Sequence, residues 1–169
     1  FTPVHDPFAD AIYSLAIIGS GGNNVRAGGR EIEHRLYKND GKGNFTIDVS
    51  AFPGNAMNIA VAAAHDYDGD GDEDLFVGSR SVPFHYGQVP QSYIYQNDGK
   101  GHFKDVAPPL IANIGMVTGA LWTDATGDAK KELVVTGQWM PTRIFSFANN
   151  AFSEVKNTGL ENMSGWWQS

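Results

Sequence analysis

The chain has 169 residues, a formal net charge of −7 at pH 7, 20 glycines, 8 prolines and no cysteine. The acidic balance argues against a nucleic-acid partner and favours a surface that binds cations or neutral ligands, and no apolar run approaches the ~18 residues of a membrane span. Without cysteine there is no disulfide and no sign of the redox compartment. The many glycines and prolines predict short strands joined by turns. The start at Phe1, without a methionine, indicates a chain that is either processed or cut from something longer.

The first apolar run, residues 14–19, resembles a strand that follows a loop. That loop would begin at Asp6 and place Asp10 at its fifth position. Phe8 and Ser14 stand where two ligands would be expected, so this degenerate loop is predicted to bind no ion. The first repeat is also expected to lack its first strand. Residues 36–45 then show alternating apolar residues around a glycine-rich turn, which is typical of a β-hairpin.

An acidic loop at residues 66–74 is the most specific feature of the sequence. Asp66, Asp68, Asp70 and Asp74 occupy loop positions 1, 3, 5 and 9, and Gly71 at position 6 can take the positive φ of a tight turn. Oxygen ligands without cysteine or histidine favour Ca²⁺ over zinc or copper. The loop therefore predicts a calcium site.

Asp72, at position 7 of this loop, is expected to contribute its backbone carbonyl. An EF-hand would need a glutamate at position 12 and a helix on each side, but position 12 is Val77 and the flanks are short apolar runs. The sequence thus predicts a calcium loop between two buried strands. The alternative is a solvated acidic turn that holds no ion.

The chain repeats itself with an offset of 58 residues. Residues 36–45 recur as 94–103, and residues 66–77 recur as 124–135. A third, degenerate copy of the hairpin motif lies at 144–152. In the second acidic loop Thr126 replaces Asp68 and Ala129 replaces Gly71. Lys130 and Lys131 could supply the positive charge there in place of an ion, and whether residues 124–132 bind one is left open.

One complete repeat contains four predicted strands, at residues 59–64, 75–79, 92–96 and 102–106. Four strands in a repeat of 50 to 60 residues are typical of a β-propeller blade. The predicted fold is therefore all-β, a β-propeller segment of about three four-stranded antiparallel blades that form an incomplete ring. The expected divisions are a blade part at 1–56, blades at 57–113 and 114–160, and the start of a further blade at 161–169.

Two long segments, residues 19–33 and 82–91, interrupt the repeat and are candidates for ligand binding. The alternative is that each is a disordered loop, or an ordered loop without a binding role. Trp122, Trp166 and Trp167 fall on predicted first strands, where packing between blades is the favoured role, whereas Trp139 is expected to be the most exposed.

The acidic loop followed by residues 75–78 resembles the calcium loop of FG-GAP/VCBS repeats, the units of integrin-α-type propellers. The stretches 36–45, 115–124 and 159–167 are similar, more narrowly, to bacterial secreted proteins related to the ASPIC/UnbV and cartilage-acidic-protein group. The resemblance implies a calcium-binding, extracellular or cell-surface propeller of the kind used in cell adhesion. Calcium ligands carry over only to the five aspartates Asp66, Asp68, Asp70, Asp72 and Asp74.

The function that follows is a calcium-stabilised extracellular propeller segment that binds a protein or a glycan. It would continue into further blades of a parent chain or pack against other chains. The alternative is part of a polysaccharide lyase or hydrolase. Motifs for a nucleophilic serine or a metal hydrolase are absent and the five histidines are scattered singly, so no catalytic residue is predicted.

Overall fold

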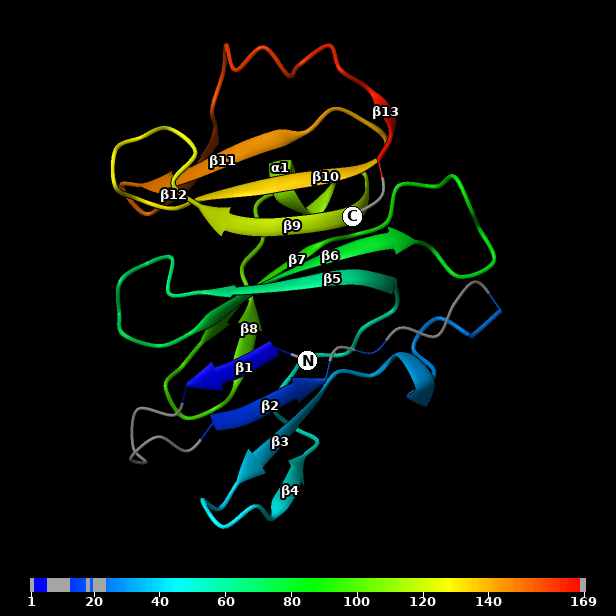
Figure 1. The fold of residues 1–169 in the computed structure, drawn as a ribbon. Helices are drawn as coiled ribbons and strands as arrows, with labels where there is room; N and C mark the ends of the chain where they lie inside the picture. The colour runs from blue at the N-terminus through cyan, green and yellow to red at the C-terminus, as the bar shows by residue number, and fades with distance from the viewer. Residues whose placement is uncertain (1, 6–12, 18, 20–23, 168–169) are drawn as a thin grey trace.

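The computed structural model describes residues 2–5, 13–17, 19 and 24–167. These residues form three antiparallel sheets that follow one another in chain order (Figure 1). The first sheet has the order β1-β2-β3-β4 and contains β1 (Thr2–His5), β2 (Tyr13–Ile17), β3 (Arg35–Asn39) and β4 (Phe45–Asp48).

The second and third sheets repeat this order. The second contains β5 (Asn58–His65), β6 (Asp74–Ser81), β7 (Tyr93–Asn97) and β8 (Phe103–Asp105). The third contains β9 (Met116–Thr123), β10 (Glu132–Met140), β11 (Arg143–Ala148), β12 (Ala151–Glu154) and the short β13 (Gly165–Trp166). Helices in the described part are a 3-10 turn, η1 (Arg30–Ile32), and α1 (Pro109–Ala112). The chain is thus all-β, a segment of an incomplete β-propeller, as the repeat predicted.

The four strands predicted for the complete repeat are confirmed, and their ends differ by two residues at most. Each sheet begins with a strand that contacts the first strand of a neighbouring sheet, because β5 packs against both β1 and β9. The hairpins pair as expected, with Leu75 opposite Ala64 and Tyr95. Strand alternation then sends neighbouring side chains to opposite faces of the sheet.

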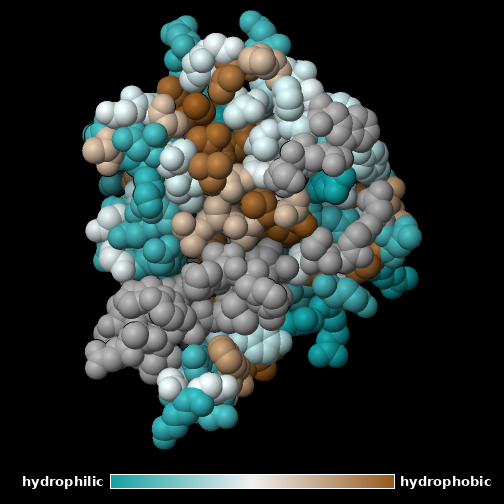
Figure 2. All heavy atoms as spheres, viewed as in Figure 1, coloured by the Kyte–Doolittle hydropathy of each residue, from teal (hydrophilic) through white to brown (hydrophobic). Residues whose placement is uncertain are grey.

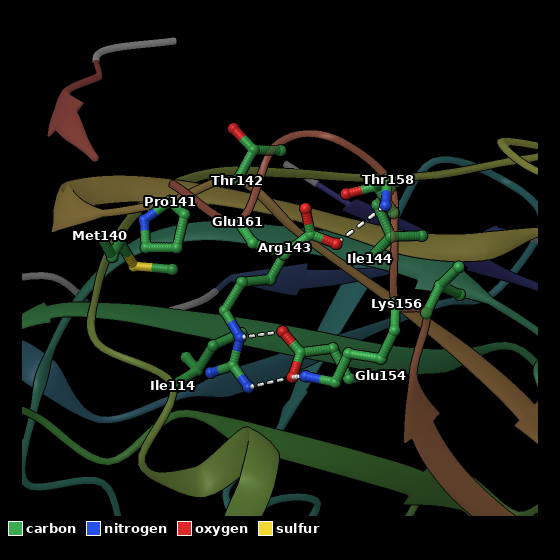
Figure 3. A pocket seen from close by; sticks show the side chains of 11 residues that line it. Ile114, Met140, Pro141, Thr142, Arg143, Ile144, Glu154, Lys156, Thr158 and Glu161 are labelled. Atoms are coloured by element: carbon green, nitrogen blue, oxygen red, sulfur yellow. Dashed lines mark hydrogen bonds and ion pairs between the residues drawn. The ribbon is translucent and has the colours of Figure 1, made fainter. Parts of the chain in front are cut away.

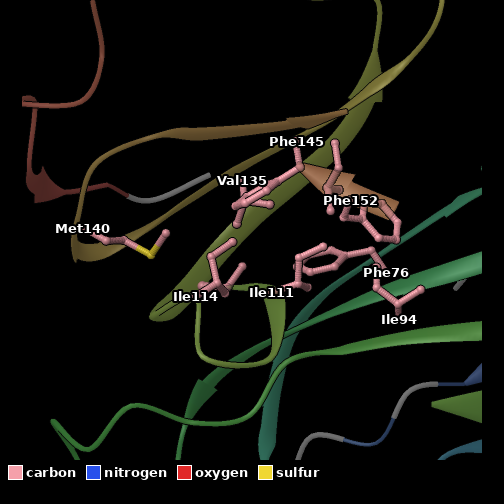
Figure 4. Close-up of a cluster of buried hydrophobic side chains, with 10 residues drawn as sticks. Phe76, Ile94, Ile111, Ile114, Val135, Met140, Phe145 and Phe152 are labelled. Atoms are coloured by element: carbon pink, nitrogen blue, oxygen red, sulfur yellow. The ribbon is translucent and has the colours of Figure 1, made fainter. Parts of the chain in front are cut away.

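Among the described side chains the hydrophobic core forms two clusters, one between the first and second sheets and one between the second and third. Leu75 and Tyr95 of the second sheet belong to the cluster shared with the first sheet. Phe76 and Ile94, one residue along each strand, belong to the cluster shared with the third sheet (Figure 4). All four side chains are fully buried. The second sheet is therefore covered on both faces.

The second and third sheets approach closely at Gly78. A Cβ atom there would lie 2.5 Å from Cγ1 of Val117 and 2.8 Å from Cγ1 of Val61. Because atoms cannot approach to that distance, a side chain at this position would push the two blades apart. Glycine at the fourth residue of the apolar run after the acidic loop thus has a packing reason.

The first strand differs from expectation. The first repeat was predicted to lack its first strand, and this is wrong, because β1 pairs with β2 with Pro3 opposite Leu15. Proline weakens a strand pattern, but it is tolerated on an edge strand, where its missing N–H group needs no partner. At the other end, β13 pairs with the end of β10, with Trp166 opposite Gln138.

Candidate metal centre

The loop between β5 and β6 is organised around the carboxylate of Asp66. Its Oδ1 accepts a hydrogen bond from the Gly69 N–H (2.8 Å) and its Oδ2 accepts one from the Gly71 N–H (3.0 Å). Gly69 and Gly71 have φ values of 79° and 97°, which glycine adopts without a steric penalty. The glycine predicted to make the tight turn does so.

Three carboxylates meet at this turn. Oxygen atoms of Asp66, Asp68 and Asp74 all lie within 4.8 Å of one another. Calcium binds oxygen ligands at about 2.3 to 2.6 Å, so oxygens on opposite sides of one ion are separated by about 5 Å. The spacing therefore suits a single ion of this kind.

Asp74 is the innermost of the three, since β6 begins there and its side chain is fully buried. Its Oδ1 accepts a hydrogen bond from the Asn97 N–H (2.8 Å), but its buried Oδ2 has no hydrogen-bond partner in the described part of the chain. Burial raises the pKa of Asp74 to about 7. A buried carboxylate oxygen without a donor is costly, and a bound cation would satisfy it.

The two remaining predicted ligands lie further out. Asp70 is exposed, and its Oδ1 accepts a hydrogen bond from the Asp72 N–H (2.9 Å). Burial, followed by the neighbouring carboxylates, raises the pKa of Asp72. Neither side chain belongs to the group of oxygens that lie within 4.8 Å.

Two residues from β7 support the loop and were not predicted from the sequence. Gln96 donates from Nε2 to Oδ2 of Asp68 (2.6 Å). Asn97 holds Asp74 through its N–H group and also donates from Nδ2 to the Glu73 carbonyl (3.2 Å). Both residues lie within the repeated hairpin motif at residues 94–103, but nothing in the motif shows that β7 ends beside the acidic loop.

The second loop, between β9 and β10, keeps the same backbone frame. Oδ1 and Oδ2 of Asp124 accept hydrogen bonds from the N–H groups of Gly127 (2.6 Å) and Ala129 (3.0 Å). At its ninth position stands Glu132, whose Oε2 accepts from the N–H groups of Ala125 (2.9 Å) and Thr126 (3.1 Å). The loop's own donors therefore satisfy this carboxylate.

Lys130 and Lys131 were considered as the source of positive charge in the second loop. Both are exposed. The hydrogen bonds to Glu132 come instead from backbone N–H groups and from the Thr126 hydroxyl. The first, degenerate loop, with Asp6, Phe8 and Asp10, lies outside the described residues.

A pocket of about 350 Å³ lies at the edge of the third sheet (Figure 3). Arg143 donates from Nε to Glu154 Oε1 (2.7 Å) and from its guanidinium to Oε2 (3.1 Å), and Lys156 pairs with the same carboxylate. The hydrogen bond from Arg143 lowers the pKa of Glu154 to about 2. Glu161 also lines the pocket, so its two cationic and two anionic side chains balance, and the lining shows no preference for a charged ligand.

The tryptophans follow the prediction in part. Trp139 is 55% exposed, as expected. Trp122 is half-buried against the cluster between the second and third sheets, and donates from Nε1 to the Ala63 carbonyl (3.2 Å). Trp167 was predicted to pack between blades, but this is wrong, because it lies beyond β13 and is 39% exposed.

Fold and site together define an incomplete propeller with a carboxylate loop between the first two strands of a blade. Residues 66–135 match the FG-GAP-like repeat family. The match starts at the first ligand position of the acidic loop and extends through the second loop into β10. The chain therefore carries an FG-GAP-like repeat. None of the curated proteins matches the chain.

Proposed function

We propose that the chain is a calcium-stabilised, extracellular propeller segment that acts as a protein- or glycan-binding module. Asp66, Asp68 and Asp74 would bind Ca²⁺ through their carboxylates, with Asp70 and Asp72 completing the oxygen shell. The observation that carries the proposal is the buried Oδ2 of Asp74, which has no hydrogen-bond donor among the described residues and lies beside two further carboxylates. A divalent cation would neutralise this repulsion and fix the turn.

The proposed role of calcium is structural, because the loop is anchored in the boundary between two blades. Tyr67, at its second position, packs edge-on to Phe147 of the third sheet (4.7 Å between ring centroids) and contacts Phe152 (5.0 Å). It also lies parallel to Trp122 at 6.3 Å. Ordering the loop would therefore order the contact between the second and third sheets.

An extracellular location is part of this proposal, because FG-GAP repeats are typically found there. Among the described residues, no helix is long and apolar enough to pass through a bilayer. Ligand binding is assigned to the long loop at residues 82–91, since propellers place variable binding loops at the ends of their strands.

The partners proposed for the chain include a further blade, from a parent chain or another chain. In the second sheet, Phe76 pairs with Ala63 and Ile94, and this row is covered by the third sheet. The corresponding row of the third sheet faces away from the second sheet.

That outer row consists of Leu121, Val134 and Ile144, with Val134 paired to both of the others. Leu121 is 51% exposed, and Val134 and Ile144 are half-buried. Apolar side chains gather over β9 and β10 on the face shown in Figure 2. This outer row is equivalent to the row of the second sheet that packs against the third sheet. It therefore suits packing against a further blade in the same orientation.

The experiment that tests the calcium role is thermal unfolding in 2 mM Ca²⁺ and in chelator. With a dissociation constant of about 10⁻⁴ M, this concentration stabilises the fold by about 1.8 kcal/mol, or roughly 4 to 7 °C. Asp68→Asn should remove most of this difference. Identical melting curves with and without chelator, after metal removal is verified by elemental analysis, would contradict the proposal.

A further inference from the structure

An aromatic pair joins the long loop of the second blade to the third blade. Tyr86, in the loop after β6, donates from its hydroxyl to Oε1 of Gln138 on β10 (2.9 Å). Its ring meets Trp139 edge-on, at 5.8 Å between centroids and 70°. Gln138 is only 1% exposed, so a buried amide holds one ring of the pair. The loop and the end of β10 lie on the same side of the molecule (Figure 1).

Both rings remain accessible although they are held in place. Tyr86 is 48% exposed and Trp139 is 55% exposed. On the same loop Phe84 is 61% exposed and Val89 is 53% exposed. Exposed aromatic residues that are fixed by neighbours offer contact area at little entropic cost, which is typical of recognition surfaces.

The backbone is strained where it presents these side chains. Trp139 has φ 57° and Phe84 has φ 64°, values that bulky residues rarely adopt. On β10, Gln138 and Met140 are both buried, and Trp139 between them is exposed. Strain of this kind persists where the surrounding structure enforces it, and it is concentrated at functional sites.

The loop is also ordered by its own contacts. The His85 N–H group donates to the Val82 carbonyl (3.0 Å), and the Gln88 N–H group donates to the His85 carbonyl (3.1 Å). Pro83 and Pro90 restrict its backbone further. The binding surface is therefore largely formed before any ligand arrives.

The chemistry of this surface favours an uncharged ligand. Residues 82–91 contain no aspartate, glutamate, lysine or arginine, in a chain whose net charge is −7. The C–H groups of a pyranose ring can stack on the electron-rich face of an indole or phenol, and side-chain amides both donate to and accept from hydroxyls. Two rings are also a small platform compared with the roughly 800 Å² that each partner buries in a stable protein interface.

We propose that the exposed indole of Trp139, held edge-on by the Tyr86 ring, forms a stacking platform for a neutral glycan, with side-chain amides of the loop at residues 82–91 contacting its hydroxyls. This inference rests on the proposed function, because it names the ligand class of the binding module. The two blades contribute one ring each, so the platform exists only when they are packed together.

The test is calorimetric titration, in calcium buffer, with three neutral oligosaccharides: cellohexaose, mannohexaose and xylohexaose. At least one should bind, with a dissociation constant of about 0.1 to 1 mM. Trp139→Ala should weaken binding at least about tenfold, and Tyr86→Phe, which keeps the ring, by less than about threefold. Phe45→Ala is the matched control, since Phe45 is 50% exposed but lies on β4 of the first sheet.

A second variant guards against a folding defect. Trp139→Asn suits the left-handed backbone and also lacks the ring, so it should lose binding while keeping the melting temperature. Saccharide binding that survives in this variant would overturn the platform but leave a binding module elsewhere on the chain. No binding of any of the three saccharides, or Trp139-dependent binding of a polypeptide instead, would overturn the glycan assignment. Calcium stabilisation is measured separately by melting, so its failure is distinguishable from these outcomes.

Discussion

The two acidic loops at 66–74 and 124–132 share one pattern of backbone hydrogen bonds, but they differ in how the carboxylate at the ninth position is satisfied. In both, the first aspartate accepts hydrogen bonds from the backbone N–H groups three and five residues later. In the first loop the ninth residue, Asp74, is buried, and one of its oxygens has no hydrogen-bond partner in the part of the chain that the structure describes. In the second, Glu132 is just as buried, but its oxygens accept from Ala125 and Thr126.

The difference shows how a repeat can dispense with a metal ion. Glutamate is one methylene longer than aspartate, so its carboxylate reaches the N–H groups of its own loop. Loss of the aspartate at the third position, now Thr126, also removes one repulsive charge and adds a hydroxyl donor. The second loop is therefore expected to be stable without calcium, and the first to depend on it.

The largest expected effect comes from breaking the closure of the second loop. Glu132→Ala would leave the N–H groups of Ala125 and Thr126 without their acceptor, and should lower the free energy of unfolding by about 3 kcal/mol. The loss should be the same with calcium and with chelator, which urea unfolding in both buffers would measure. A loss that calcium restores would show that the second loop also binds the ion.

His34, which lies outside both loops, is expected to lower the free energy of unfolding by about 2 kcal/mol between pH 7 and pH 5. This change adds to any effect of acid on the two loops. Burial lowers the pKa of His34 to about 4, and its ring packs edge-on to Phe52 and Tyr95. Between pH 6.5 and 4 the unfolded chain binds a proton that the folded chain does not, so stability falls as pH falls, by up to about 1.4 kcal/mol per unit.

The measurement is urea unfolding at pH 7 and pH 5 in calcium buffer. His34→Phe should flatten this part of the pH dependence, whatever its effect on stability at pH 7. An unchanged slope in the variant would assign the acid sensitivity to carboxylates instead.

Substitution of the aspartate at the fifth position should reduce the stabilisation by calcium in the first loop but not in the second. The expected change in the free energy of unfolding is about 1.5 kcal/mol. Asp70→Ala is expected to reduce the rise in melting temperature that calcium produces, because it removes an oxygen from the site. Asp128→Ala is the matched change in the second loop, where the Asp128 carboxylate accepts from the Lys130 N–H (2.9 Å). It should leave the calcium response intact, and equal responses in the two variants would refute the comparison.

The smallest effect concerns the sixth position, and it should have opposite signs in the two loops. Gly71 has φ 97° and Ala129 has φ 67°, both in the left-handed region. Gly71→Ala should destabilise the fold by about 0.5 to 1 kcal/mol, and Ala129→Gly should stabilise it by about 0.5 kcal/mol. Paired denaturation curves would detect this reversal, and two changes of the same sign would show that the loops differ in backbone conformation.

Much of the fold could be predicted from the sequence because the signals are local. Alternating apolar residues placed β5 to β8, and the 58-residue offset showed that β9 and β10 repeat β5 and β6. β1 was not predicted, because it has only four residues and one of them, Pro3, disfavours a strand. The pairing of β13 with β10 could not be predicted, because it joins residues that are distant in the chain.

The sequence by itself determined the pattern of the acidic loop, because the alternating aspartates and the glycine at position 6 all lie within nine consecutive residues. Only the tertiary structure decided which carboxylate lacks a donor, because the burial of Asp74 depends on packing against β7, whose Asn97 lies 23 residues further on. It also decided that Tyr86 and Trp139 meet, since they are 53 residues apart and come together only where two blades pack. Local patterns specify turns and strands, whereas burial and the sites it creates depend on contacts between distant segments.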